Sequence, residues 1–196
     1  KYLKDSCQLE ITEEQTGIIK KIDLKEFSKD TEENVIPILT QIPGDELFKM
    51  NELGLKNLKI INYYDNANYS LATESITLGK NYTDLGIIMH EWGHAKDNLM
   101  FKDINELINN DKELFKIFKK ERDLFRKNFS ESQLNQVSYL ISDKHYCGTD
   151  KAIIEGIADT NTLLNTYPQN NTQAIRTHYW QQYFPETISY LAKLII

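Results

Sequence analysis

The residues of this chain that could do chemistry are gathered in one short motif, His90-Glu91-Trp92-Gly93-His94. On a helix, side chains four positions apart lie on one face, with their Cβ atoms about 5–6 Å apart. Both imidazoles of the motif can then reach one zinc ion at about 2.0–2.1 Å. Glu91 lies about 100° around the helix from His90, where its carboxylate can take a proton from a water that the metal activates. The spacing therefore predicts a zinc site with Glu91 as general base.

Two acids further along the chain, Glu155 and Asp159, could complete this site. A zinc ion with two histidine ligands needs a third protein ligand and keeps its fourth position for water. Glu155 lies 61 residues after His94 on another predicted helix, and Asp159 lies one turn further on the same face. A metal-bound histidine commonly donates its other N–H to a carboxylate, which is the role expected for Asp159. Apolar neighbours such as Ile153 and Ile157 indicate a buried helix, where an idle acid is disfavoured.

The segments that must position these residues follow from the pattern of apolar and β-branched side chains. Residues 1–80 mix strand-like and helix-like segments, whereas residues 81–196 are predicted to form successive helices that carry the zinc site. This order predicts an α+β fold, with a small mixed sheet in the N-terminal part followed by a helical C-terminal half. The expected strands are residues 18–24, 57–64 and 74–78. The expected helices are residues 30–41, 45–53, 84–99, 112–127, 130–141, 150–164 and 172–184, with a last one from Pro185.

Capping residues indicate where several of these helices begin and end. Asp84 and Asp111 stand where a side chain can accept hydrogen bonds from the first backbone amides of a helix. Gly54 stands where a left-handed residue commonly closes a helix, and Pro185 suits a first helical turn. The cap at Asp84 places the H-E-x-x-H motif inside a helix, as zinc binding requires.

Composition and charge narrow the class of protein. The 196 residues, of which 40% are apolar, fit one domain spanning residues 1–196. The 23 basic and 29 acidic residues disfavour a nucleic-acid-binding role. No apolar run approaches the ~20 residues of a membrane-spanning helix. Residues 1–15 lack the apolar stretch of a signal peptide, although the chain could be the mature part of a secreted precursor.

Four segments of the chain resemble the lethal factor-like zinc metallopeptidases, the family that includes the catalytic domain of anthrax lethal factor. They are also similar to the related secreted bacterial Pro-Pro endopeptidases. The four segments are residues 90–97 (HEWGHAKD), 114–125, 155–159 and 184–187 (FPET). The resemblance implies a gluzincin-type, zinc-dependent endopeptidase that is secreted, hydrolyses peptide bonds in protein substrates and binds the substrate in extended form.

The resemblance also assigns roles to individual residues. The implied roles are zinc ligand for His90, His94 and Glu155, general base for Glu91, and ligand-supporting acid for Asp159. The family places a catalytic tyrosine shortly before the third ligand, and the candidate here is Tyr146, nine residues before Glu155. His145 and Tyr139 are alternative hydrogen-bond donors to the oxyanion.

The predicted strand 74–78 stands directly before the zinc helix and is the expected edge of the sheet. An exposed edge can bind an extended peptide, because the unpaired backbone groups of the strand pair with the main chain of the peptide. The sequence therefore predicts that a peptide substrate aligns on this strand, beside the zinc site.

Other interpretations of the motif remain open. Paired histidines on a helix can be core residues without a metal. The chain could also be a non-catalytic or toxin-associated binding domain whose zinc is structural, with Cys147 as a fourth ligand that fills the open position. A metal-bound Cys147 could not form a disulfide with Cys7, the other cysteine of the chain. A further alternative is an intracellular peptidase of a regulatory kind, because H-E-x-x-H motifs occur in many zinc enzymes.

Overall fold

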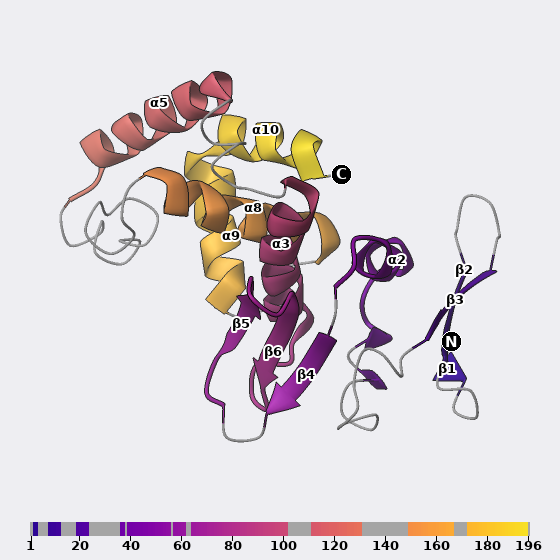
Figure 1. Ribbon diagram of the computed structural model, residues 1–196. Coiled ribbons are helices and arrows are strands. Elements are labelled where there is room, and N and C mark those ends of the chain that lie inside the picture. The colour runs from indigo at the N-terminus through magenta and orange to yellow at the C-terminus, as the bar shows by residue number, and fades with distance from the viewer. Residues whose placement is uncertain are drawn as a thin grey trace.

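The computed structural model has the α+β architecture that the sequence predicts, with every described strand within the first 80 residues and helices in the remainder (Figure 1). It describes residues 2–3, 8–12, 19–23, 36–37, 39–55, 57–61, 64–101, 111–130, 149–166 and 172–195. The predicted helices 30–41 and 130–141 lie mostly outside these ranges and stay predictions.

The described strands form two separate sheets of three strands each. Their bounds are β1 Tyr2–Leu3, β2 Gln8–Thr12, β3 Ile19–Asp23, β4 Asn57–Ile61, β5 Ala67–Ser70 and β6 Ser75–Gly79. The first sheet is antiparallel throughout, with β2 between β1 and β3. The second sheet is mixed, because its central strand β6 pairs in parallel with β4 and antiparallel with β5. In Figure 1 this mixed sheet lies below the helices, whereas the first sheet lies beyond α2 (Gly44–Glu52).

The prediction that strand 74–78 forms the edge of the sheet is wrong. β6 lies at the centre of the mixed sheet, so its backbone is paired on both sides. The edge strand that packs against the motif helix α3 (Leu85–Phe101) is β5. The sequence pattern did not reveal β5 because its four residues, Ala67-Asn68-Tyr69-Ser70, are few and mostly polar, and short polar segments lack the apolar alternation that marks a strand.

The helices of the described residues match the predicted segments closely. Their bounds are α2 Gly44–Glu52, α3 Leu85–Phe101, α5 Lys112–Asn128, α8 Thr149–Asn165, α9 Thr172–Tyr183 and α10 Pro185–Ile195. Asp84 and Asp111 accept hydrogen bonds of 3.1 and 3.0 Å from backbone amides three residues ahead, which confirms both predicted caps. Gly54, which follows the C-cap residue Leu53 of α2, has a positive φ of 83°, as expected of a closing glycine.

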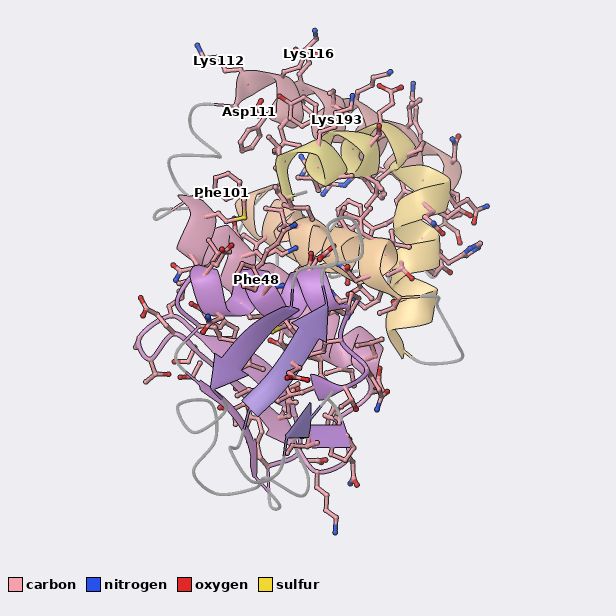
Figure 2. All side chains as sticks on the ribbon, turned by 90° about the vertical axis from the view of Figure 1, so that its right-hand side faces the viewer. Phe48, Phe101, Asp111, Lys112, Lys116 and Lys193 are labelled. Carbon is pink, nitrogen blue, oxygen red and sulfur yellow. The ribbon has the colours of Figure 1, made fainter. Side chains whose placement is uncertain are left out.

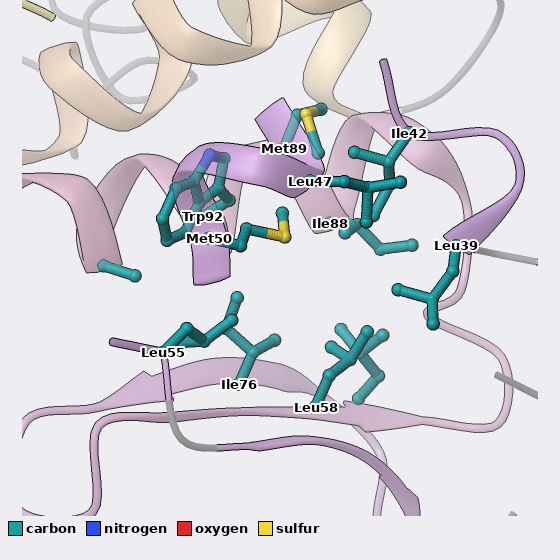
Figure 3. Close-up of a cluster of buried hydrophobic side chains, with 12 residues drawn as sticks. Leu39, Ile42, Leu47, Met50, Leu55, Leu58, Ile76, Ile88, Met89 and Trp92 are labelled. Atoms are coloured by element: carbon teal, nitrogen blue, oxygen red, sulfur yellow. The ribbon is translucent and has the colours of Figure 1, made fainter. Parts of the chain in front are cut away.

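Two apolar clusters hold the helices and the mixed sheet together. In the first, Met50 of α2 and Trp92 of α3 lie above Leu58 and Ile76 of the sheet, as Figure 3 shows. The second cluster joins α5, α8, α9 and α10 and is built largely from aromatic side chains such as Phe118. Burial of this apolar surface is the main driving force for folding. α3 belongs to the first cluster and α8 to the second, and the two helices pack along each other where the clusters adjoin.

The outer face of α5 is charged and solvated. Figure 2 shows Lys112 and Lys116 at the outer end of the molecule with their ammonium groups in solvent. Lys120 forms an exposed ion pair with Glu186 of α10, with an Nζ–Oε1 distance of 2.7 Å. Among the described residues, no helix combines the length and apolarity needed to cross a membrane.

Candidate metal centre

The two histidines of the H-E-x-x-H motif lie side by side on α3. The helix starts directly after the Asp84 cap, so positions 90 and 94 fall one turn apart within it. The ring centroids of His90 and His94 are 4.8 Å apart, and the rings are nearly perpendicular, at 85°. His90 is buried, whereas 19% of the His94 side chain is exposed. One face of α3 thus presents two imidazoles, one of which solvent can reach.

Helix α8 brings Glu155 to the same place. Glu155 Oε2 lies 3.4 Å from His90 Nε2, and Glu155 Oε1 lies 3.7 Å from His94 Nε2. One ligand atom from each of the three residues can be chosen so that all lie within 4.8 Å of one another. Ligands about 2.0–2.2 Å from a tetrahedral zinc ion are separated by roughly 3.4 Å. This group of two imidazoles and one carboxylate could therefore hold a metal ion, and its donor set suits zinc.

The close approach of α3 to α8 depends on Gly93, in the middle of the motif. A Cβ atom at this position would lie 2.5 Å from Ala158 Cα, which is closer than real contacts allow. Asn161 of α8 donates a hydrogen bond of 2.6 Å to the Met89 carbonyl, directly before His90. The glycine and this side-chain hydrogen bond together set the distance and register between the two helices that carry the candidate ligands.

Asp159 lies beside His90, where its position one turn after Glu155 predicts it. Asp159 Oδ1 is 2.8 Å from His90 Nδ1, and the Asp159 side chain is fully buried. Its other oxygen, Oδ2, accepts a hydrogen bond of 2.9 Å from Trp180 Nε1. Because Nδ1 is engaged, Nε2 is the His90 nitrogen that faces Glu155 and is left for a metal ion.

The two imidazoles differ in protonation. Burial lowers the pKa of His90, but the charge and the hydrogen bond of Asp159 outweigh burial, and the pKa rises to about 9. Burial and the neighbouring charge of His90 lower the pKa of His94 to about 4. At neutral pH the metal-free cluster therefore contains one imidazolium and one neutral imidazole. A metal ion must displace the proton from His90, so metal binding competes with protonation.

Glu155 is held in its ionised form. Burial by itself raises the pKa of this carboxyl, but the hydrogen bond from His90 and the charges of His94, His90 and Arg176 lower it well below its usual value. An ionised carboxylate is the form that binds a metal ion, so the surroundings of Glu155 prepare it for that role.

Glu91 lies on α3 beside the edge strand β5. Only 7% of Glu91 is exposed, and burial raises the pKa of its carboxyl. The charge of His90 and a hydrogen bond from the Tyr69 backbone in β5 act against this rise. Burial therefore makes the Glu91 carboxyl hold its proton more strongly than an exposed glutamate would. The geometry therefore gives Glu91 the environment of a proton acceptor.

Arg176 of α9 is a residue of the centre that the sequence analysis missed. Its Nη2 donates a hydrogen bond of 2.5 Å to Glu155 Oε2, and its Nε donates one of 3.3 Å to Asp159 Oδ2. Arg176 and Trp180 are four residues apart and so lie on one face of α9, from which both donate to Asp159. That spacing of two donors was the available sequence signal, but only the packing of α9 shows which acids it faces.

Several predicted residues lie outside the described part of the chain. Tyr146, the expected catalytic tyrosine, is one of them, as are the alternative donors His145 and Tyr139. The same holds for Cys147, the expected fourth ligand of a structural zinc site, and for Cys7. Their roles stay predictions.

The chemistry of the centre must be argued from its own residues. Comparison of the chain with protein-family models, with curated proteins and with solved structures finds no match. The centre combines three side chains that could ligate a metal ion with Glu91, a largely buried carboxyl group directly after His90 in the chain. The three candidate ligands are consistent with a metal site of the H-E-x-x-H kind.

Proposed function

We propose that the chain is a zinc-dependent endopeptidase of the gluzincin type, related to the lethal factor-like peptidases that its sequence resembles. The observation that carries the proposal is the meeting of His90, His94 and Glu155, whose ligand atoms lie within 4.8 Å of one another. A structural zinc site is closed by four protein ligands, whereas a catalytic site uses three and keeps one position for water. The described residues supply three candidate ligands, which is the number that a catalytic site uses.

Glu91 is the general base in this proposal. A zinc ion held by the three ligands would lower the pKa of water toward ~7 and polarise the scissile carbonyl. Glu91 takes the proton of the attacking water and later delivers it to the leaving amine. The hydrogen bond from the Tyr69 backbone orients the Glu91 carboxylate before a substrate arrives. Tyr146 is proposed to stabilise the oxyanion by a hydrogen bond, a contribution of ~3 kcal/mol for comparable donors.

The proposed substrate is a protein segment bound in extended form along β5. This strand is the edge of the mixed sheet that packs against α3, so a peptide paired with it lies next to the candidate ligands. Main-chain hydrogen bonds to an edge strand supply affinity with little dependence on side chains. Secretion of the protein, which the resemblance implies, completes the proposal.

The proposal is tested by cleavage of a random peptide library, read by mass spectrometry with and without a chelator, and by the zinc content of the purified chain. We expect one zinc per chain and cleavage that the chelator abolishes. Glu91→Gln should retain the zinc and lose nearly all turnover, because an amide cannot accept the proton. Glu113→Gln changes an exposed glutamate of α5 and should alter neither quantity.

Other outcomes are equally informative. Undiminished turnover in Glu91→Gln would remove Glu91 as the base. A wild-type chain that holds zinc but cleaves no member of the library would support the structural-zinc alternative. A wild-type chain that binds no zinc would refute the assignment of His90, His94 and Glu155 as zinc ligands.

A further inference from the structure

Arg176 contacts both carboxylates of the metal centre with a single guanidinium group. It donates to Glu155 Oε2 through Nη2 at 2.5 Å and to Asp159 Oδ2 through Nε at 3.3 Å. The Arg176 side chain is 19% exposed and Asp159 is fully buried, so the guanidinium contacts with the two acids are largely shielded from solvent. An arginine bound to two acids is expected to hold both in fixed orientations, because its N–H groups form a rigid fork.

These contacts close a ring of four side chains. His90 lies between the two acids, with Nε2 at 3.4 Å from Glu155 Oε2 and Nδ1 at 2.8 Å from Asp159 Oδ1. Arg176 joins the same two acids on their other side. The orientation of Glu155 is therefore coupled to that of His90 through Arg176 of α9, a helix that carries none of the three candidate ligands.

The two ends of the ring are supported unequally. Asp159 Oδ2 accepts a second hydrogen bond, from Trp180 Nε1 at 2.9 Å, and Oδ1 is engaged by His90. Asp159 is thus held in place by residues other than Arg176. The shorter of the two guanidinium contacts goes to Glu155, where Arg176 donates to Oε2. The other oxygen of Glu155, Oε1, faces His94 Nε2 at 3.7 Å. The effect of Arg176 should fall mainly on Glu155.

We propose that Arg176 is a positioning residue that occupies Glu155 Oε2 and so restricts this ligand to one oxygen. A carboxylate oxygen in a charge-assisted hydrogen bond to a guanidinium is less available to a metal ion. A zinc ion bound by two histidines and one carboxylate oxygen keeps an uncrowded fourth position for water, whereas a carboxylate that binds through both oxygens adds a fifth ligand atom that competes with the water for space. Arg176 thus preserves the open position that hydrolysis needs, an inference that rests on the proposed function.

The experiment uses cobalt in place of zinc, because the visible absorption of Co²⁺ reports its coordination number. Wild-type protein should give the strong spectrum of a four-coordinate ion. Arg176→Gln frees Glu155 Oε2, so its absorption should weaken by roughly twofold or more as the coordination number rises to five. Turnover of a cleaved library peptide should fall in kcat with little change in KM.

Trp180→Phe is the matched control, because it removes a donor from the same helix and leaves the Arg176 contact with Glu155 in place. It should keep the four-coordinate spectrum of the wild type. Arg176→Lys, which retains a cation able to engage Oε2, should also keep most of that spectrum. If Arg176→Gln does not fold, Arg176→Met replaces it and is refolded in the presence of cobalt. Its Co²⁺ absorption should weaken in the same way.

An unchanged spectrum in Arg176→Gln would overturn the inference and leave the proposed function standing. A weakened spectrum of equal size in Trp180→Phe would also overturn it, because the effect would then come from general loosening of α9. A wild-type chain that takes up no cobalt would refute both the inference and the proposed function.

Discussion

Helix α3 contributes to two buried polar clusters that differ in how their charges are balanced. One is the metal centre. The other, here called the closed network, consists of Glu46, Trp92, Lys96 and Asn161 and lies on another side of the same helix. Both clusters join α3 to α8, and both contain a carboxyl group in a largely buried position.

The closed network contains its own cation. Lys96 Nζ lies between Glu46 Oε2 at 2.5 Å and Asn161 Oδ1 at 2.8 Å. Glu46 Oε2 also accepts a hydrogen bond of 2.6 Å from Trp92 Nε1. Asn161 donates its amide to the Met89 carbonyl. Each of these side chains has a partner within the protein, so the network is complete without a bound ion.

The metal centre is arranged differently, because acceptor atoms face one another there. Glu155 lies 3.4 Å from His90 Nε2 and 3.7 Å from His94 Nε2, and His94 is neutral because its pKa is lowered to about 4. In the metal-free protein, the proton on His90 separates these acceptors, since the pKa of that imidazole is about 9. The closed network is thus satisfied by its own side chains, whereas the other cluster gathers ligand atoms of His90, His94 and Glu155 that could hold an external cation.

The largest expected effect that separates the two clusters is the loss of metal binding in His94→Ala. Removal of one of three candidate ligands should abolish stoichiometric zinc, because too few ligands remain. The metal-free stability should change by about 1 kcal/mol or less, since the side chain is partly exposed and uncharged. Zinc content and urea unfolding measure the two effects. His178→Ala, at an exposed histidine of α9, should keep the zinc, and zinc retained by His94→Ala would contradict the assignment.

Lys96→Met should show the opposite behaviour, with a loss of stability and retention of the metal. It leaves the largely buried Glu46 carboxylate with only the more distant Lys49, 3.5 Å from Oε1, and loss of a buried ion-pair partner costs up to about 3–5 kcal/mol. Addition of Glu46→Gln should restore much of the loss, because an amide is neutral and still accepts from Trp92. Urea unfolding of the single and double variants measures this.

Lys120→Met is the control, because it breaks an exposed ion pair and should barely shift the urea midpoint. A small loss in Lys96→Met would show that the network is not needed.

Asp97 tests a third situation on α3, a buried carboxyl that belongs to neither cluster. Only 4% of Asp97 is exposed, its Oδ1 has no hydrogen-bond partner in the described part of the structure, and burial raises its pKa to about 7. Between the unfolded pKa of about 3.9 and the folded value, the folded state binds more protons, so stability falls as pH rises through this window. Above the folded pKa the dependence ends.

The measurement compares wild type with Asp97→Asn, which does not titrate. The advantage of the variant in the free energy of unfolding should grow by about 2 kcal/mol between pH 5 and pH 7 and then level off. Glu52→Gln, at an exposed glutamate, should show no such growth. A constant difference across this range would mean that Asp97 stays ionised in the folded protein.

Gly93→Ala should affect both clusters, with the smallest expected effect. The added Cβ would lie 2.5 Å from Ala158 Cα and would force α3 and α8 apart. Overpacking costs about 1–3 kcal/mol, and the better helix propensity of alanine offsets about 1 kcal/mol of it. Zinc affinity should fall along with stability.

Gly54→Ala is the control, because it strains a left-handed turn outside both clusters. It should lower stability and leave zinc affinity unchanged. Equal zinc affinity in Gly93→Ala and wild type would show that the helix spacing tolerates the methyl group.

Much of the framework was predictable from the sequence, and the exceptions have physical causes. The caps at Asp84 and Asp111 and the glycine after α2 act within one helical turn, so they could be recognised locally. The edge strand β5 could not, because a short polar strand is stabilised by its pairing with β6 and not by a pattern of its own. Arg176 was missed for a related reason, since nothing in the sequence of α9 shows that it faces Glu155 and Asp159.

The sequence was enough to predict the α+β class, the helix that bears His90 and His94, and the placement of Glu155 and Asp159 on one face of a second helix. These features depend on helical periodicity and capping, which operate over a few residues. The packing of the folded chain was needed to show that the two helices meet at Gly93, that β5 forms the edge of the mixed sheet, and that Arg176 contacts the acids of the centre. Such contacts join residues far apart in the chain, and their geometry follows from how whole faces of helices pack together.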